Sequence, residues 1–235
     1  HTFETRKLPA GSRVRIVQLS DLHMERFGKR ERRMVYLTEG QRPDIIVLTG
    51  DYLNDFGGSE SRSLALLREI GGRLSRIAPT YAIEGNWDGN EQLQALFDNG
   101  VKPVKRWMAL KTRTGSRIAL GSLVWRAGIA TVSGPSGMKG LYSVALCHIP
   151  QSLEGVDTGG IDLILAGHTH GGQIRIPIFG ALMPDRALVG KCQAGVYRIS
   201  HSWLYVNRGI GMEGGAPRVR FCCRPEVAVI DIVGR

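Results

Sequence analysis

The stretch Gly167-His168-Thr169-His170-Gly171-Gly172-Gln173 places two histidines two residues apart in a glycine-rich run. It directly follows an apolar segment, residues 161–166 (IDLILA), that is typical of a buried strand. A strand that ends in so many glycines predicts a loop tight enough to need glycine dihedrals. Because neutral imidazole is the commonest metal ligand, the loop is a candidate metal site. A histidine pair without a metal is an equal alternative for this stretch alone.

Other predicted strands end in polar residues in the same way. Before residue 100, strands are predicted at 13–19, 44–49 and 80–83, and helices at 27–38, 61–77 and 91–97. After residue 100, strands are predicted at 104–110, 117–125, 141–147, 161–166, 195–199, 203–206, 219–222 and 227–232. Helices thus concentrate early and hairpins late. The pattern predicts a single α/β domain over residues 1–235, with ligands bound at the carboxyl ends of the strands.

The polar residues at these strand ends form a set of mixed chemistry. Its members are Asp21, His23, Asp51, Asn86, His148, His168 and His170. Carboxylate, amide and imidazole ligands together suit Mn²⁺, iron or Zn²⁺, and no cysteine set for a structural zinc is present. Seven ligands divide naturally over two ions if one carboxylate bridges them. Two divalent ions roughly 3.5–4 Å apart favour phosphoryl transfer, because they bind the reacting oxygens and generate hydroxide from water.

Each member of the set also has a purely structural explanation. Asp21 could cap a following helix, and Asp51 and Asn86 could hold turns. His148 could be a hydrogen-bonded core histidine. The metal interpretation therefore rests on all seven residues sharing one position, the end of a strand.

Five short blocks occur in a fixed order along the chain: Asp21-X-His23, Gly50-Asp51, Gly85-Asn86-X-Asp88, His148 and Gly167-His168-X-His170. In sequence and order they resemble the blocks of the calcineurin-like metallophosphoesterase superfamily. The resemblance implies a four-layer α/β/β/α sandwich with two mixed sheets. It also implies two divalent ions, with Mn²⁺ preferred over iron or zinc. Asp21, His23 and His170 would hold the first ion, and Asn86, His148 and His168 the second, while Asp51 would bridge them.

Two longer stretches, 166–174 and 204–211, are similar to a bacterial membrane-associated branch of the superfamily. That branch includes phosphodiesterases and enzymes that cleave UDP-diacylglucosamine in lipid A synthesis. It implies a bacterial protein that is peripheral to a membrane or anchored in it. The resemblance further implies that Asp51, Asn86 and Asp88 take part in catalysis, with Asp88 orienting a ligand or a neighbouring histidine.

Trp87 departs from the family pattern, which most often has histidine at this position. That histidine usually points at the substrate phosphate and can protonate the leaving oxygen, whereas an indole supplies no acidic proton. General acid catalysis contributes typically ~10²–10⁴-fold and matters least for a leaving group that is already a stable anion. We therefore expect a phosphoric anhydride or activated diester substrate, with Trp87 stacking on a base or lining a lipid-facing cleft. Alternatively, a neighbouring residue replaces the histidine.

The bulk composition agrees with an anionic substrate. The net charge is +10 and the pI is about 9.8, which favours phosphorylated partners, nucleic acid or acidic lipids over neutral ones, although a merely basic surface is also open. Candidates for phosphate contact are Arg208 and the basic run Lys29, Arg30, Arg32 and Arg33. The segment 176–183 (IPIFGALM) suits an amphiphilic partner.

The expected function is hydrolysis of a lipid-linked nucleotide such as UDP-diacylglucosamine by a monomeric enzyme. The alternatives are a nucleotide or nucleic-acid phosphodiesterase, which lacks support from any nucleic-acid-binding module, and a binding scaffold, which would not need seven ligands. The chain begins at His1 rather than methionine, which leaves open a leader or anchor ahead of it.

Overall fold

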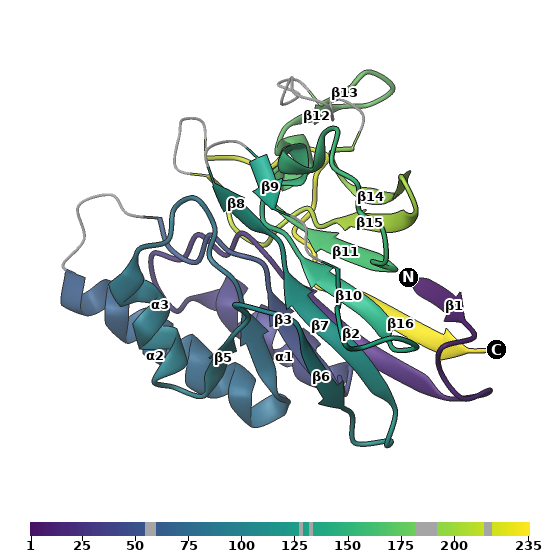
Figure 1. Ribbon diagram of the computed structural model, residues 1–235. Coiled ribbons are helices and arrows are strands. Elements are labelled where there is room, and N and C mark those ends of the chain that lie inside the picture. The colour runs from purple at the N-terminus through teal and green to yellow at the C-terminus, as the bar shows by residue number, and fades with distance from the viewer. Residues whose placement is uncertain (55–59, 127–128, 132–133, 182–191, 214–217) are drawn as a thin grey trace.

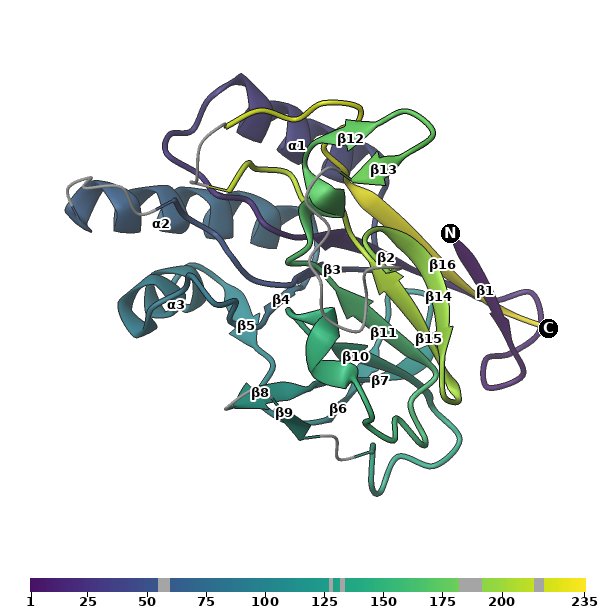
Figure 2. The same ribbon diagram turned by 90° about the horizontal axis from the view of Figure 1, so that it is seen from above.

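Two six-stranded sheets pack face to face, and three helices cover the outer face of one of them (Figure 1, Figure 2). The computed structural model describes residues 1–54, 60–126, 129–131, 134–181, 192–213 and 218–235. The helices are α1 (Lys29–Gly40), α2 (Glu60–Ile77) and α3 (Asn90–Phe97). None of the described helices combines the length and the apolarity that crossing a bilayer requires.

The first sheet carries the helices and has the strand order β1-β16-β2-β3-β4-β5. The bounds are β1 (Thr2–Thr5), β16 (Ala228–Gly234), β2 (Arg13–Leu19), β3 (Ile45–Leu48), β4 (Thr80–Ala82) and β5 (Val101–Pro103). Strands β2 to β5 run parallel, because a helix returns the chain between each pair. Their carboxyl ends therefore lie at one edge of the sheet.

The second sheet has the order β14-β15-β11-β10-β7-β6. The bounds are β14 (Gly195–Ile199), β15 (Ser202–Val206), β11 (Leu163–Ala166), β10 (Tyr142–Leu146), β7 (Arg117–Ser122) and β6 (Met108–Lys111). The four central strands are parallel and both edge strands are antiparallel to their neighbours. Two small hairpins accompany the sheets, β8 (Val124–Arg126) with β9 (Ile129–Thr131), and β12 (Arg175–Ile176) with β13 (Gly180–Ala181).

The main core lies between the sheets. Alternate residues of β2 and β3 meet β10 and β11 there, so that Ile16 and Val47 share a cluster with Val144 and Leu165. The runs 45–48 and 163–166 are buried along their whole length, as expected for strands covered on both faces. On the other face of the first sheet, α2 contributes a helical stripe of Leu67, Ile70 and Leu74.

The expectation of two mixed sheets is confirmed. In the described ranges, α-helices fill one outer layer only. The outer face of the second sheet is covered by the 3₁₀ turn η1 (Pro150–Leu153) and the loop after it, through Leu153 and Val156. The chain is thus thinner on that side than the family resemblance implies.

Three strand predictions are wrong. The predicted strand 117–125 is divided, because β7 ends at Ser122 and β8 belongs to a separate hairpin. The predicted strand 104–110 is correct only from Met108 on, since residues 104–107 connect β5 in the first sheet to β6 in the second and Lys105 and Arg106 are exposed. Apolar residues on both sides of this crossing imitate one strand. The predicted strand 219–222 is reduced to a single bridge between Phe221 and Ile174. Strand β1 was not predicted, because a four-residue edge strand carries little periodicity.

Candidate metal centre

The carboxyl ends of parallel strands from both sheets deliver the predicted polar residues to one place. From the first sheet, the loops after β2, β3 and β4 carry Asp21, His23, Asp51 and Asn86. From the second sheet, the loops after β10 and β11 carry His148, His168 and His170. The structure brings all seven together, although they are spread over 150 residues of sequence, and they form two groups.

Five of the seven residues have a backbone conformation that L-residues rarely adopt. Their φ angles are positive: 51° for Asp21, 40° for His23, 57° for Asp51, 69° for His168 and 50° for His170. Such strain costs of the order of 1–3 kcal/mol per residue and persists only where the surroundings enforce it. Five strained residues in these loops indicate that the fold places their side chains for function, at a cost in stability.

Two glycines make this convergence possible. A side chain at Gly167 would collide with Ser20 Oγ and with the carboxylate of Asp21. A side chain at Gly85 would collide with the carboxylate and backbone nitrogen of Asp51. These glycines allow a loop to contact a carboxylate at the end of another strand, which is a requirement for close approach and differs from the glycine dihedrals predicted for the stretch.

The first group consists of Asp21, His23 and His170, all buried. His23 Nε2 and His170 Nε2 are 3.1 Å apart, and His170 Nε2 is 3.6 Å from Asp21 Oδ1. Burial lowers the pKa of His23 to about 4 and that of His170 well below its ordinary value. Both imidazoles are therefore neutral and able to donate a lone pair to a cation.

The second group consists of Asp51, His148 and His168, with Asn86 beside it. His148 Nε2 is 3.2 Å from Asp51 Oδ2 and 2.9 Å from Asn86 Oδ1. His148 Nδ1 is 2.6 Å from the carbonyl oxygen of Thr49, which can only accept, so Nδ1 carries the proton. In the neutral ring this leaves the lone pair of Nε2 facing the group, as in a metal-binding histidine.

Asp51 joins the two groups. Its Oδ2 is 3.2 Å from His148 Nε2 in one group and 3.7 Å from His23 Nε2 in the other. Its Oδ1 accepts the backbone N–H of Trp87 at 3.0 Å, which fixes the carboxylate plane. One oxygen of a single carboxylate thus lies between the two sets of ligands, where a bridging ligand is required.

The electrostatics of the site also call for cations. Burial lowers the pKa of His148, but the hydrogen bond and charge of Asp51 outweigh burial and raise it to about 9. Burial raises the pKa of Asp21 to about 6, because it outweighs the charge of His148 and the hydrogen bonds from Ser20 and His168, which lower it. In addition, His23 Nδ1 is buried without a hydrogen-bond partner among the described residues. Carboxylates and imidazoles in this arrangement fit two divalent ions.

Asp88 does not point at either group. Its Oδ2 accepts the backbone N–H groups of Asp51 and Gly85, both at 2.8 Å, and its Oδ1 accepts that of Tyr52 at 2.9 Å. Burial raises its pKa to about 6. The carboxylate ties the loop after β3, which carries Asp51, to the loop after β4, which carries Asn86.

Trp87 and Arg208 are the predicted substrate contacts. The ring of Trp87 meets the ring of His23 edge-on, with centroids 6.1 Å apart, so the indole borders the first group. Arg208 Nε is 3.1 Å from Glu226 Oε2, and its pKa is raised by that hydrogen bond. A phosphate bound by Arg208 would have to compete with Glu226.

Sequence reasoning missed Arg220. Its Nε donates to the carbonyl oxygen of Gly211 at 2.7 Å and its Nη1 to that of His170 at 3.2 Å, while Nη2 lies 3.2 Å from His170 Nδ1. This guanidinium fixes the loop that carries His170. No sequence signal marks Arg220, because it lies in a short apolar and basic segment that was predicted to be a strand.

Known proteins resemble this chain throughout. The calcineurin-like phosphoesterase family model matches residues 14–172, which include all seven residues. The chain belongs to the calcineurin-like phosphoesterases. It is 31% identical over 240 residues to phosphodiesterase YaeI of Escherichia coli, covering 93% of this chain and 82% of that protein. It is 30% identical over 247 residues to the uncharacterized metallophosphoesterase YkuE of Bacillus subtilis, covering 99% and 84%.

Among solved structures, an archaeal phosphodiesterase superposes with a TM-score of 0.45 at 12% identity, over 83% of this chain and 84% of that one. As a calcineurin-like phosphoesterase, the protein is a metal-dependent hydrolase of phosphate esters. The binuclear divalent metal centre of the family corresponds to the two groups of ligands described above.

The metal-free enzyme should become more stable at neutral pH when Asp21 is replaced by asparagine. An unfolded Asp21 titrates near 3.8 and the folded carboxyl near 6, so stability is lost as the pH rises through this interval. The loss is on the order of 3 kcal/mol, and the variant does not incur it. Thermal unfolding with a chelator present should give a higher Tm for Asp21→Asn at neutral pH and no gain near about pH 4. Asp98→Asn, at an exposed carboxylate, is the control; a less stable Asp21→Asn at neutral pH would show that burial of the charge is not the cause.

Proposed function

We propose that the protein hydrolyses a phosphoric anhydride or phosphodiester bond in a lipid-linked nucleotide, UDP-diacylglucosamine being the model compound. The observation that carries the proposal is the position of Asp51 Oδ2 between the two groups of ligands, next to a tryptophan in place of an acid. Asp21, His23 and His170 would hold one ion, and Asn86, His148 and His168 the other, with Asp51 shared. The ions, preferentially Mn²⁺, supply an activated water and neutralise phosphate charge.

The chain's own residues orient the substrate and leave the expelled oxygen without a proton donor. Trp87 borders the first group with its indole, which has no acidic proton. A leaving group bound there departs as an anion. Phosphate and nucleoside monophosphate anions are stable at neutral pH, whereas alkoxides are not, so anhydrides are favoured over alkyl phosphomonoesters.

Trp87→His should therefore improve hydrolysis of β-glycerophosphate, whose leaving group is an alkoxide, by at least about tenfold. It should change hydrolysis of p-nitrophenyl phosphate little, since nitrophenolate needs no protonation. The measurement is kcat/KM with Mn²⁺ for both esters. Trp87→Phe separates the gain of an acid from the loss of the indole. An equal change on both esters would contradict the leaving-group argument.

The hairpin of β12 and β13 supports a substrate at a membrane surface. It starts five residues after His170, and its exposed apolar side chains are Ile176, Ile178 and Phe179. Ile178 is fully exposed and Phe179 is 87% exposed. Leu182 and Met183, which complete the predicted apolar segment, lie outside the described residues. A hairpin inserted among lipid head groups would hold the ligand groups beside the membrane surface, and we propose a bacterial enzyme that is peripheral or anchored there.

Replacing Ile178 and Phe179 together by serine should weaken binding to lipid vesicles by about tenfold or more, because each buried apolar side chain contributes about 1.5–3 kcal/mol. Co-sedimentation with phosphatidylcholine–phosphatidylglycerol vesicles measures this. Tyr36→Ser, which removes an exposed aromatic ring from α1, is the control. Unchanged sedimentation of the double variant would exclude the hairpin as the membrane contact.

A hydrolysis panel tests the substrate. It compares UDP-diacylglucosamine, bis-p-nitrophenyl phosphate, p-nitrophenyl phosphate and single-stranded DNA with Mn²⁺, Fe²⁺ or Zn²⁺ supplied to the metal-stripped enzyme. The proposal expects the highest kcat/KM for UDP-diacylglucosamine with Mn²⁺. A preference for single-stranded DNA would favour the nuclease alternative, and binding of UDP-diacylglucosamine without turnover would favour a scaffold.

A further inference from the structure

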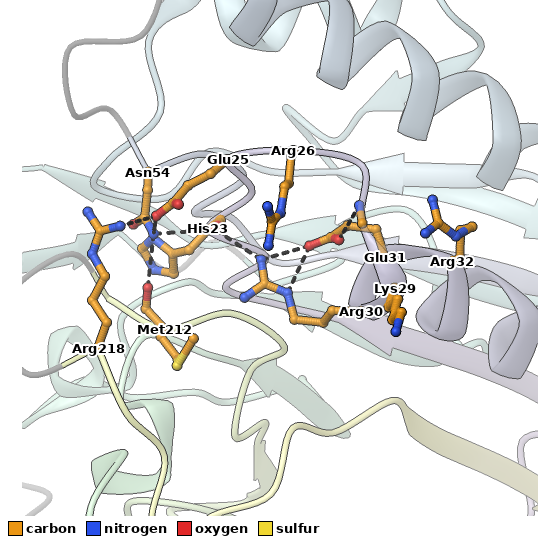
Figure 3. Close-up of a pocket in the computed structure, with 11 residues that line it drawn as sticks. His23, Glu25, Arg26, Lys29, Arg30, Glu31, Arg32, Asn54, Met212 and Arg218 are labelled. Carbon is orange, nitrogen blue, oxygen red and sulfur yellow. Dashed lines mark hydrogen bonds and ion pairs between the residues drawn. The ribbon is translucent and has the colours of Figure 1, made fainter.

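A basic cavity of about 740 Å³ adjoins the candidate metal centre. His23, a predicted ligand of the first ion, forms one wall, and the others come from the start of α1 and from Asn54, Met212 and Arg218 (Figure 3). The charged side chains around it are Arg26, Lys29, Arg30, Arg32 and Arg218, together with Glu25 and Glu31. Five cations thus face two carboxylates, and Met212 is the single apolar side chain of the described lining.

The two carboxylates are already engaged. Glu25 forms an ion pair with Arg218, and Glu31 forms one with Arg30 at 2.7 Å. Glu31 also accepts the backbone N–H of Gly28 at 2.8 Å, which caps α1. Glu25 and Glu31 therefore neutralise Arg218 and Arg30. The other basic side chains of the cavity have no acidic partner in its described lining.

Arg26 and Lys29 carry this excess. Both are exposed, and neither side chain makes a hydrogen bond or ion pair with a residue in the described part of the chain. Figure 3 shows the guanidinium groups of Arg26 and Arg30 in the space between His23 and Glu31. Arg33, the last member of the predicted basic run, does not line the cavity and lies over the ring of Tyr36 instead.

We propose that this cavity binds a second phosphate of the substrate while the phosphate that is cleaved lies at the metal centre. The inference rests on the proposed function and narrows it to substrates with two phosphoryl groups. A phosphate anion suits the uncompensated charge of Arg26 and Lys29, and guanidinium groups bind phosphate oxygens through paired hydrogen bonds. Because His23 lines the cavity, its occupant lies within reach of the centre.

The test compares inhibitors with one and two phosphates in the Mn²⁺-loaded enzyme. Hydrolysis of bis-p-nitrophenyl phosphate is the reporter, and the pairs are UMP against UDP and fructose 6-phosphate against fructose 1,6-bisphosphate. Wild type should bind at least one two-phosphate member about tenfold more tightly than its partner. In Arg26→Ala/Lys29→Ala that preference should fall to about twofold or less. Arg33→Ala/Arg113→Ala removes the same charge outside the cavity and should keep the wild-type preference.

Each failure has its own signature. No reporter hydrolysis by wild type contradicts the proposed function, and calorimetric titration of UMP and UDP into the Mn²⁺-loaded protein then tests the cavity directly. If Arg26→Ala/Lys29→Ala keeps the wild-type preference for two-phosphate inhibitors, the inference is wrong. It is also wrong if this variant loses as much kcat/KM for bis-p-nitrophenyl phosphate as it loses affinity for the two-phosphate inhibitors. Weaker binding to phosphatidylglycerol vesicles with an unchanged preference would assign the cations to a lipid head group instead.

Discussion

Replacing Asp51 by alanine should abolish every phosphoesterase activity of the protein, with a loss of at least about 10³-fold in kcat/KM. Even a residue that only supports a metal ligand typically costs 10–100-fold when it is removed. Asp51 has a larger role, since its Oδ2 faces His148 at 3.2 Å and His23 at 3.7 Å. Removing it takes a ligand from both ions at once.

The variant should also bind less metal. Elemental analysis after dialysis should give less than the wild-type metal content, and excess Mn²⁺ should not restore the rate. Asp51→Asn keeps the shape of the side chain and removes its charge, so it separates bridging by a carboxylate from packing. Asp98→Ala, at an exposed carboxylate on the end of α3, is the control. Any activity that survives in Asp51→Ala arises elsewhere than at this site.

The site could be predicted because its chemistry is tied to strand ends. The strand at residues 13–19 is β2 as predicted, and the polar residues that follow it are the first two ligands of the set. The apolar strand before His168 is shorter than expected at its start, yet it ends at Ala166 as predicted. The ligands follow the carboxyl ends of parallel strands, which lie at one edge of the sheet. An error of two residues in the predicted start of a strand therefore does not change where its ligands lie.

What the sequence did not reveal depends on contacts between distant residues. Nothing local marks Arg220 as the residue that holds the His170 loop, since its partners are backbone carbonyl oxygens. The left-handed backbone of Asp21 and Asp51 is likewise invisible, because such dihedrals are expected of glycine and here are enforced by surrounding packing. The cavity beside His23 combines the start of α1 with Arg218, which is nearly two hundred residues away in the chain.

Asp88 was predicted to take part in catalysis. It could do so either as an acid or as a positioning residue, and its contacts distinguish these two roles. As an acid it would give a proton to the leaving group, and its pKa of about 6 would suit that task. As a positioning residue it would hold the loops of Asp51 and Asn86, and its three backbone hydrogen bonds use both carboxylate oxygens for this. The contacts favour positioning.

Asp88→Asn should therefore weaken Mn²⁺ binding by about 10–100-fold and leave kcat at saturating Mn²⁺ within a few-fold of wild type. The amide nitrogen must face at least one backbone N–H, which costs about 1–3 kcal/mol. The neutral amide also avoids the burial of charge that raises the pKa of Asp88 to about 6, so these opposing effects should leave Tm near neutral pH little changed. The measurements are Mn²⁺ titrations of activity and of Tm. Glu84→Gln, at an exposed carboxylate in the same loop, should change neither. If Asp88 were the acid, kcat would stay low at every Mn²⁺ concentration, and more so for β-glycerophosphate than for p-nitrophenyl phosphate, because only the alkoxide needs the proton.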